Sequence, residues 1–126
     1  MKKIILALCL CVLVFAQCNE AYAIFFDGNK LLEYWQSYKT LAIEVSPHST
    51  MKTVSYSNLF LGYVSGVADT GNEDYFSIPQ TVTIGQLCEI VGQFLEKEPD
   101  LQAYNGAVLV MMALKEVFPK TEPQEE

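Results

Sequence analysis

Residues 83–95, with the sequence TIGQLCEIVGQFL, carry the clearest helix signal in this 126-residue chain. Thr83 and Gln86 form a capping box, in which the Thr83 hydroxyl accepts the amide proton of Gln86 and the Gln86 side chain reaches back. Pro99 follows and ends the helix. Apolar residues recur every three or four positions and predict a buried face made of Ile84, Leu87, Cys88, Val91 and Leu95.

Three other segments show helical spacing of their apolar residues. One follows the capping residues 27–29 and ends before Pro47, another runs from about Met51 to Ala68, and the last follows Asp100, a candidate N-cap, up to Pro119. Their expected apolar faces are Leu31, Trp35, Tyr38, Ala42 and Val45, then Tyr56, Phe60, Tyr63, Val64 and Val67, then Leu101, Tyr104, Val108, Met111, Leu114 and Phe118. The sequence predicts an all-α fold, a small bundle of four main helices in a single domain over residues 24–119.

Two glycines, Gly62 and Gly66, lie four residues apart in the second segment. Each costs a helix interior about 1 kcal/mol relative to alanine. The pair therefore predicts that another helix crosses closely at this point, as in small-xxx-small packing. The alternative is that the helix ends near Gly62.

Residues 1–23 have the features of a signal peptide. Lys2 and Lys3 precede an apolar run over 4–16, and Ala21-Tyr22-Ala23 fits the cleavage pattern. The run is shorter than the roughly 20 residues that span a membrane, so no membrane association is expected after cleavage. Cleavage is expected before Ile24, and the leader predicts a bacterial periplasmic or secreted protein. The alternatives are a cut after Ala16 or lipidation at Cys18.

Loss of the leader leaves Cys88 as the only cysteine, which excludes a disulfide scaffold. Six lysines then face fourteen carboxylates, a formal charge of −8, and arginine is absent. Without arginine, nucleic acid is not an expected partner. The negative charge suits a basic partner, or serves solubility alone. The polar tail, residues 120–126, is expected to be disordered.

No residue pattern favours an enzyme, a cofactor or a metal. Cys88 lies on an apolar face, where a packed thiol is expected, and the sole histidine, His48, stands in a loop. Asp69, Glu73 and Asp74 could bind calcium, but they lack the alternating spacing and the closing glutamate of an EF-hand.

The longest expected loop, residues 69–80 (DTGNEDYFSIPQ), is the candidate binding site. It combines three carboxylates with an aromatic pair, and loops on a rigid scaffold often carry function. The candidate partner-binding residues are Asp69, Glu73, Asp74, Tyr75, Phe76 and Ser77. Tyr75 and Phe76 are the expected anchors; alternatively, Phe76 folds back into the core.

An ordered set of short motifs spans nearly the whole mature chain. They are Phe26–Glu33, Phe60–Asp69, Ile78-Pro79, Val82–Leu87, Phe94–Pro99, Ala113-Leu114 and Phe118-Pro119. The set resembles the Rap/Tai family of immunity proteins, which protect bacteria from peptidoglycan amidases injected by type VI secretion systems. The resemblance implies a small helical periplasmic protein that forms a homodimer and plugs the active site of a cysteine amidase. Residues 69–77 best match the family's inhibitory loop.

The chain departs from the family at three positions where members carry cysteines. They read Trp35, Ser77 and Lys120, so the family's disulfides cannot form and packing must hold the helices. Trp35 is expected to fill part of that volume. Two other readings stay open, a periplasmic acid-stress chaperone and a structural or assembly subunit.

Overall fold

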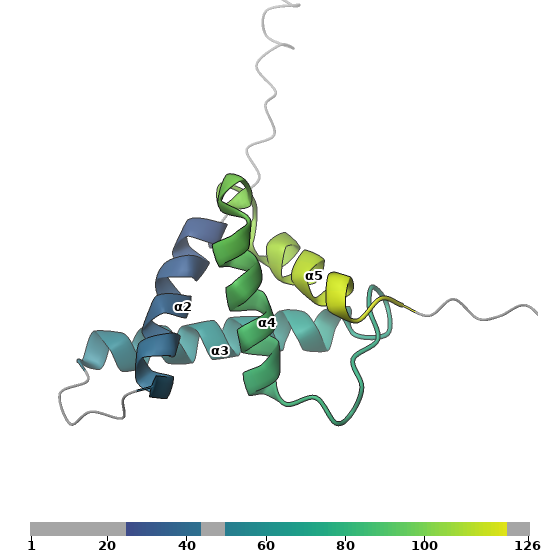
Figure 1. The fold of residues 1–126 in the computed structure, drawn as a ribbon, viewed down its shortest axis with the longest axis horizontal. Coiled ribbons are helices and arrows are strands. Elements are labelled where there is room, and N and C mark those ends of the chain that lie inside the picture. The colour runs from purple at the N-terminus through teal and green to yellow at the C-terminus, as the bar shows by residue number, and fades with distance from the viewer. Residues whose placement is uncertain (1–24, 44–49, 121–126) are drawn as a thin grey trace, which may run out of the picture.

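The structure, a computed structural model, describes residues 25–43 and 50–120. In these ranges it contains α2 (Gly28–Ile43), α3 (Met51–Gly71), α4 (Ile84–Lys97), the 3-10 helix η1 (Pro99–Leu101) and α5 (Gly106–Val117), and no strand (Figure 1). The predicted all-α fold with four main helices is therefore confirmed. The leader, Pro47, His48 and the tail beyond Lys120 lie outside the described residues. None of the described helices has the length and apolarity to cross a bilayer.

The longest helix, α3, runs across the width of Figure 1, and α2 and α4 cross it. α5 lies beside α4, and a long loop connects the end of α3 to the start of α4. All four helices contribute to one core, whose buried side chains are Leu31, Tyr34, Trp35, Phe60, Val64, Ala68, Phe76, Leu87, Cys88, Val91, Leu95, Leu109, Val110, Ala113 and Leu114. Of the predicted faces of α2 and α3, the core contains Leu31, Trp35, Phe60 and Val64, while Tyr38, Tyr56, Tyr63 and Val67 are partly buried against it. Ala42 was predicted on the buried face of α2 but is exposed near the end of that helix, and Val45 lies outside the described residues.

The capping box at the start of α4 is present as predicted. The Thr83 hydroxyl accepts from the Gln86 amide at 3.3 Å, and the Gln86 side chain accepts from the Thr83 amide at 2.8 Å. The helix ends at Lys97, ahead of Pro99. The predicted face is buried except at Ile84, which is 37% exposed because it is the first residue of the helix and lies at the core margin.

The predicted start of α5 is wrong. Asp100 lies in η1, and Asn105 caps α5 by accepting from the Ala107 amide at 2.9 Å. The helix consequently buries Leu109, Val110, Ala113 and Leu114 and exposes Val108, while Tyr104 precedes it with 59% exposure. The sequence GAVLVMMALKEV is apolar on nearly all sides, so its spacing does not select one face.

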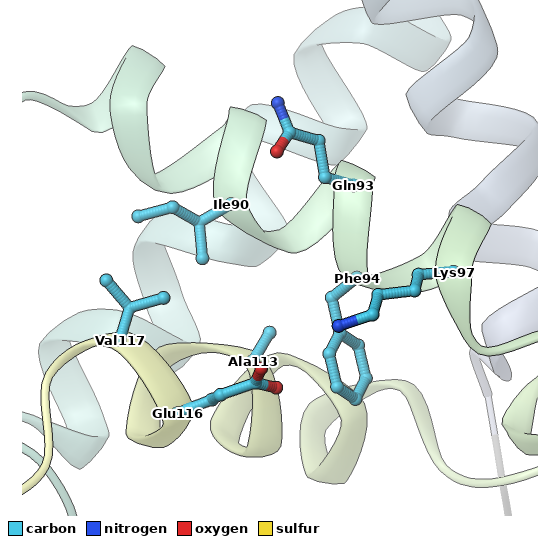
Figure 2. A pocket seen from close by; sticks show the side chains of 7 residues that line it. All are labelled: Ile90, Gln93, Phe94, Lys97, Ala113, Glu116 and Val117. Carbon is cyan, nitrogen blue, oxygen red and sulfur yellow. The ribbon is translucent and has the colours of Figure 1, made fainter.

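An apolar groove of about 170 Å³ remains open between α4 and α5. Figure 2 shows its lining, with Ile90, Gln93, Phe94 and Lys97 from α4 and Ala113, Glu116 and Val117 from α5. Val117 is half exposed here, and Val108 and Met112 are also exposed on α5. The pair α4–α5 thus leaves apolar surface uncovered within the described part of the chain.

The N-terminal ends of α2 and α5 are joined by backbone hydrogen bonds. The Gly28 amide donates to the Tyr104 carbonyl at 3.1 Å, and the Gly106 amide donates to the Phe26 carbonyl at 2.8 Å. A Cβ at Gly28 would lie 2.7 Å from the Cα of Gln102. Glycine is required here because the two backbones approach too closely for a side chain.

Trp35 of α2 packs against Gly92 of α4 at the centre of the bundle. A Cβ at Gly92 would lie 2.2 Å from Cδ2 of the Trp35 indole, so the ring occupies the space of the missing side chain. The same indole lies against Phe60 of α3, with ring centroids 5.6 Å apart. One buried side chain of α2 therefore contacts both α3 and α4.

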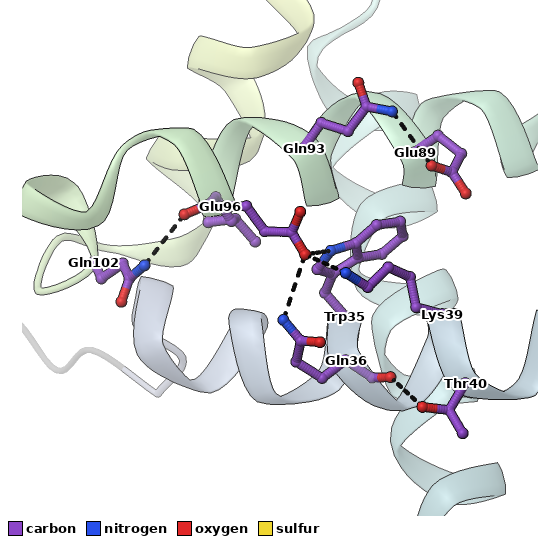
Figure 3. A network of polar contacts seen from close by, with 9 residues as sticks. Trp35, Gln36, Lys39, Thr40, Glu89, Gln93, Glu96 and Gln102 are labelled. Atoms are coloured by element: carbon purple, nitrogen blue, oxygen red, sulfur yellow. Dashed lines mark hydrogen bonds and ion pairs between the residues drawn. The ribbon is translucent and has the colours of Figure 1, made fainter.

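The polar edge of Trp35 is satisfied by Glu96, one helical turn beyond Gly92. The indole N–H donates to Oε1 of Glu96 at 2.8 Å, and Lys39 forms an ion pair with the same oxygen (Figure 3). The Lys39 ammonium, followed by the Trp35 N–H, lowers the pKa of Glu96 below its usual value. Packing and hydrogen bonding thus fix α2 on α4 together.

The predicted close helix crossing at Gly62 and Gly66 is absent. Both glycines are exposed in the middle of α3, and a Cβ built at either has no atom within 4 Å among its described surroundings. The alternative is wrong as well, because α3 continues to Gly71. The close approaches instead occur at Gly28, Gly71, Gly92 and Gly106.

We predict opposite effects of alanine at two helix glycines. Gly92→Ala should destabilise the protein by about 1–3 kcal/mol, because the methyl group overlaps the Trp35 ring. Gly62→Ala, the matched control, should stabilise it by up to about 1 kcal/mol, because an exposed helix position favours alanine. Urea unfolding followed by circular dichroism measures both. Equal effects of the two substitutions would contradict the Trp35–Gly92 packing.

We predict that the stabilisation from Glu96 is lost in acid. A depressed folded-state pKa means that the carboxylate stabilises the protein above its unfolded pKa of about 4.3, and that this contribution disappears as pH falls through the folded pKa. Glu96→Gln should cost about 0.5–1 kcal/mol at pH 7, a value kept small by partial exposure of the pair, and less at pH 3.

The free energy of unfolding in urea at the two pH values tests this dependence. Glu89→Gln is the control, since Glu89 is exposed on the same helix and forms no ion pair among the described residues. A cost of Glu96→Gln that is as large at pH 3 as at pH 7 would show that the ion pair contributes nothing.

Candidate partner-binding site

The expected loop begins with a tight turn over residues 72–77. α3 extends to Gly71, so Asp69 stands on the last turn of the helix and not in the loop. Three backbone hydrogen bonds close the turn, from Asn72 to the Ala68 carbonyl at 2.9 Å, from Tyr75 to Gly71 at 2.9 Å and from Glu73 to Phe76 at 2.8 Å. Glu73 adopts a positive φ of 69°, the left-handed conformation that reverses the chain.

Phe76 anchors this turn to the core. Its side chain is fully buried, and a Cβ at Gly71 would lie 2.7 Å from its ring. The expected exposure of the aromatic pair is therefore wrong for Phe76, and the alternative that it folds back into the core is right. The physical reason is that Gly71, at the end of α3, leaves room for the ring to fold under the turn.

The C-terminal end of α5 holds the other side of the turn. The Ser77 amide donates to the Phe118 carbonyl at 3.1 Å, and Phe76 pairs with Pro119 in an isolated antiparallel bridge. The Ile78 amide donates to the side-chain oxygen of Asn72 at 2.9 Å. Ser77 therefore acts here through its backbone. The turn is fixed at both ends.

Tyr75 and the acidic side chains are the exposed part of the turn. Tyr75 is 55% exposed, and Asp69, Glu73 and Asp74 are exposed as well. In the described residues, the only carboxylates in ion pairs are Glu33 and Glu96. The structure thus presents one aromatic side chain near three carboxylates without an ion-pair partner, on a turn that backbone contacts hold in place.

A groove of about 410 Å³ opens beside the turn, and residue spacing alone did not reveal it. It lies between the end of α3 and the chain that leads into α4, where Ile78 and Val82 face Ala68 and Leu87. Asp69, on the last turn of α3, and Asn72, the first residue of the tight turn, both line the groove. The only sequence signal that could have found it is the short alternation of polar and apolar residues over 81–84, next to Ile78.

Cys88 has the properties of a packing residue. It is fully buried, and burial raises the pKa of its thiol to about 11, although a hydrogen bond with Tyr38 lowers it in part. A thiol that stays protonated at neutral pH is a poor nucleophile. Among the described residues, no three side chains of the metal-binding types come together.

Residues 27–119 match the sequence model of the Rap1a immunity proteins. The chain belongs to this family. The match covers all four helices and the turn, and it agrees with the resemblance found in the motifs. A comparison with curated proteins gave no significant match. An immunity protein of this family binds an effector protein, so the exposed surfaces described above are the relevant features.

We predict that the two aromatic residues of the turn differ sharply in their effect on stability. Phe76→Ala should destabilise the protein by about 3–5 kcal/mol, because it empties a buried site against Gly71. Tyr75→Ala should change the free energy of unfolding by less than about 0.5 kcal/mol, since an exposed side chain contributes little. Chemical unfolding of both variants measures the difference, and a large cost at Tyr75 would show that this ring is a core residue.

Proposed function

We propose that this protein binds and inhibits a peptidoglycan amidase effector of a type VI secretion system, with Tyr75 entering the catalytic cleft. The observation that carries the proposal is the position of Tyr75, exposed on a turn that Phe76 and Phe118 hold against the bundle. Membership of the Rap1a immunity proteins supplies the class of partner, an effector. The amidase chemistry comes from the motif resemblance.

The fixed turn suits an inhibitor because it is ordered before binding. Its backbone hydrogen bonds, and the burial of Phe76 next to Tyr75, remove conformational freedom that a flexible loop would lose on entering a cleft. Tyrosine is among the residues that most often anchor interfaces, because it is large, rigid and amphipathic. Tyr75 is therefore the proposed anchor, and Phe76 supports it from the core.

The carboxylates around the anchor favour a basic rim on the effector. Glu73 and Asp74 lie in the turn next to Tyr75, and Asp69 stands on the last helical turn of α3 before it, all exposed. Charges at the rim of an interface mainly steer association and suppress wrong partners. We therefore propose that these carboxylates mainly increase the association rate, whereas Tyr75 mainly slows dissociation of the complex.

The site of action follows from the predicted leader, which would deliver the mature chain to the periplasm, where peptidoglycan is cut. The family resemblance also implies a homodimer. The uncovered apolar surface of α4 and α5, including Phe94, Met112 and Val117, supports this assembly, because methionine and aromatic residues are enriched at interfaces. Neither the periplasmic location nor the homodimer requires a disulfide bond.

We predict that Tyr75→Ala weakens binding to the cognate amidase at least about 30-fold, the loss expected for an anchor worth 2 kcal/mol or more, mainly through faster dissociation. Asp74→Asn should chiefly slow association. Calorimetric titration and surface plasmon resonance measure the two effects, with the amidase inactivated at its catalytic cysteine.

Tyr104→Ala is the matched control, since Tyr104 is 59% exposed at the opposite end of α4, in the connection to α5. It should bind like the wild type. If folded Tyr75→Ala binds the amidase as tightly as wild type, the turn is not the inhibitory element.

A further inference from the structure

The groove beside the turn has an apolar floor and a polar rim. Ala68 and Leu87 are almost fully buried at its base, and Ile84 contributes an exposed apolar side. Asp69 and Ser65, both from α3, belong to the rim. Its volume of about 410 Å³ is within the range of sites that accept a ligand-sized group.

The lining of this groove carries one negative charge and no positive charge. Asp69 is the only charged residue in its lining, and no lysine lines it. Glu73 and Asp74 follow on the adjoining turn. Lys30, Lys39 and Lys52 form ion pairs with Glu33 and Glu96 on other parts of the surface. Lys120 follows Pro119, which pairs with Phe76 of the turn, but it does not line the groove. An occupant with positive charge next to an apolar group would complement both features of the groove.

Two occupants from this protein itself suit the groove poorly. The tail over residues 121–126 contains Glu122, Glu125 and Glu126 and no lysine, so it would place like charges beside Asp69. A second copy is already assigned to the apolar surface of α4 and α5, and none of the residues that line the groove there lines this one. The complementary occupant is therefore a segment of another, basic protein.

We propose that this groove binds an exposed segment of the effector in which an apolar side chain stands next to a lysine or arginine. The apolar group packs on Ala68 and Leu87, and the cation pairs with Asp69. Asn72 lines the same groove, and its side-chain oxygen accepts the amide proton of Ile78 just after the turn. The identity of the partner rests on the proposed function, whereas the chemistry of the groove does not.

The groove can be tested without an effector, by a pair of tetrapeptides. Acetyl-Lys-Leu-Lys-Phe-amide is titrated into the 15N-labelled mature protein, with acetyl-Glu-Leu-Glu-Phe-amide as the control for apolar contact alone. We expect millimolar binding of the basic peptide, with NMR shifts at Asp69, Ile78, Val82 and Ile84, and none from the acidic peptide. Equal shifts from both peptides, or shifts only outside the groove, would overturn the proposal.

Two matched pairs of variants localise the contact. Ser65→Trp, which fills the groove, should abolish the shifts, whereas Ser55→Trp, exposed on α3 outside the groove, should leave them unchanged. Asp69→Lys should weaken the peptide about fivefold or more, the upper range for one exposed charge pair. Asp100→Lys carries the same charge change outside the groove and should weaken the peptide much less. Equal losses of affinity in the two variants would show that the peptide responds only to the net charge of the protein and does not contact Asp69.

The amidase then separates this proposal from the proposed function. If the groove contacts the effector, Ser65→Trp should weaken its binding at least tenfold while Ser55→Trp does not. A folded Ser65→Trp protein that binds the amidase normally would overturn the groove's place in the interface, even with Tyr75 confirmed as the anchor. Peptide binding without any binding of wild type to the amidase would contradict the proposed function and leave the groove chemistry standing.

Discussion

The packing of Trp35 on Gly92 is the contact on which the rest of this bundle depends. The indole fills the space of the side chain that Gly92 lacks, contacts Phe60 of α3, and bonds through its N–H to Glu96. These contacts fix α4 relative to both α2 and α3. Because α4 begins at the Thr83 capping box, they also set where the chain from α3 must arrive.

The same constraint gives the turn its rigidity. The connection from Gly71 to Thr83 has both ends fixed by helices, and its first part is held by Phe76 below and by Phe118 at the side. An exposed Tyr75 on such a support needs little ordering on binding, which is an advantage for an inhibitor. The uncovered apolar surface of α4 and α5 lies on other residues, so the proposed dimer and the proposed inhibition use different parts of the bundle.

Two features explain how the domain holds together without the cysteines that the family resemblance leads one to expect. At position 35 a tryptophan buries a large aromatic surface between three helices. At position 77 a backbone hydrogen bond to Phe118 joins the turn to the end of α5.

Paired and unpaired charges lie in different parts of the described chain. Lys30 and Lys52 lie over the Tyr56 ring and pair with Glu33, while Asp69, Glu73 and Asp74 remain without an ion-pair partner in the described chain.

The sequence by itself determined the features that depend on local chemistry. The capping box, the stop before Pro99, the four helices and the burial of Cys88 all follow from neighbours within a few residues. Composition also singles out residues 69–77 as the candidate binding segment, in which Tyr75 is exposed.

Tertiary structure alone decided the features that depend on distant partners. Phe76 is buried because Gly71 and the end of α5 make a site for it, and nothing in its immediate sequence distinguishes it from exposed Tyr75. α5 is apolar on nearly all sides, so only its neighbours select the buried face. Glycines in helices likewise look alike in the sequence. Gly92 contacts the Trp35 ring of another helix, whereas Gly62 faces solvent, and this difference depends on which residues approach from elsewhere in the chain.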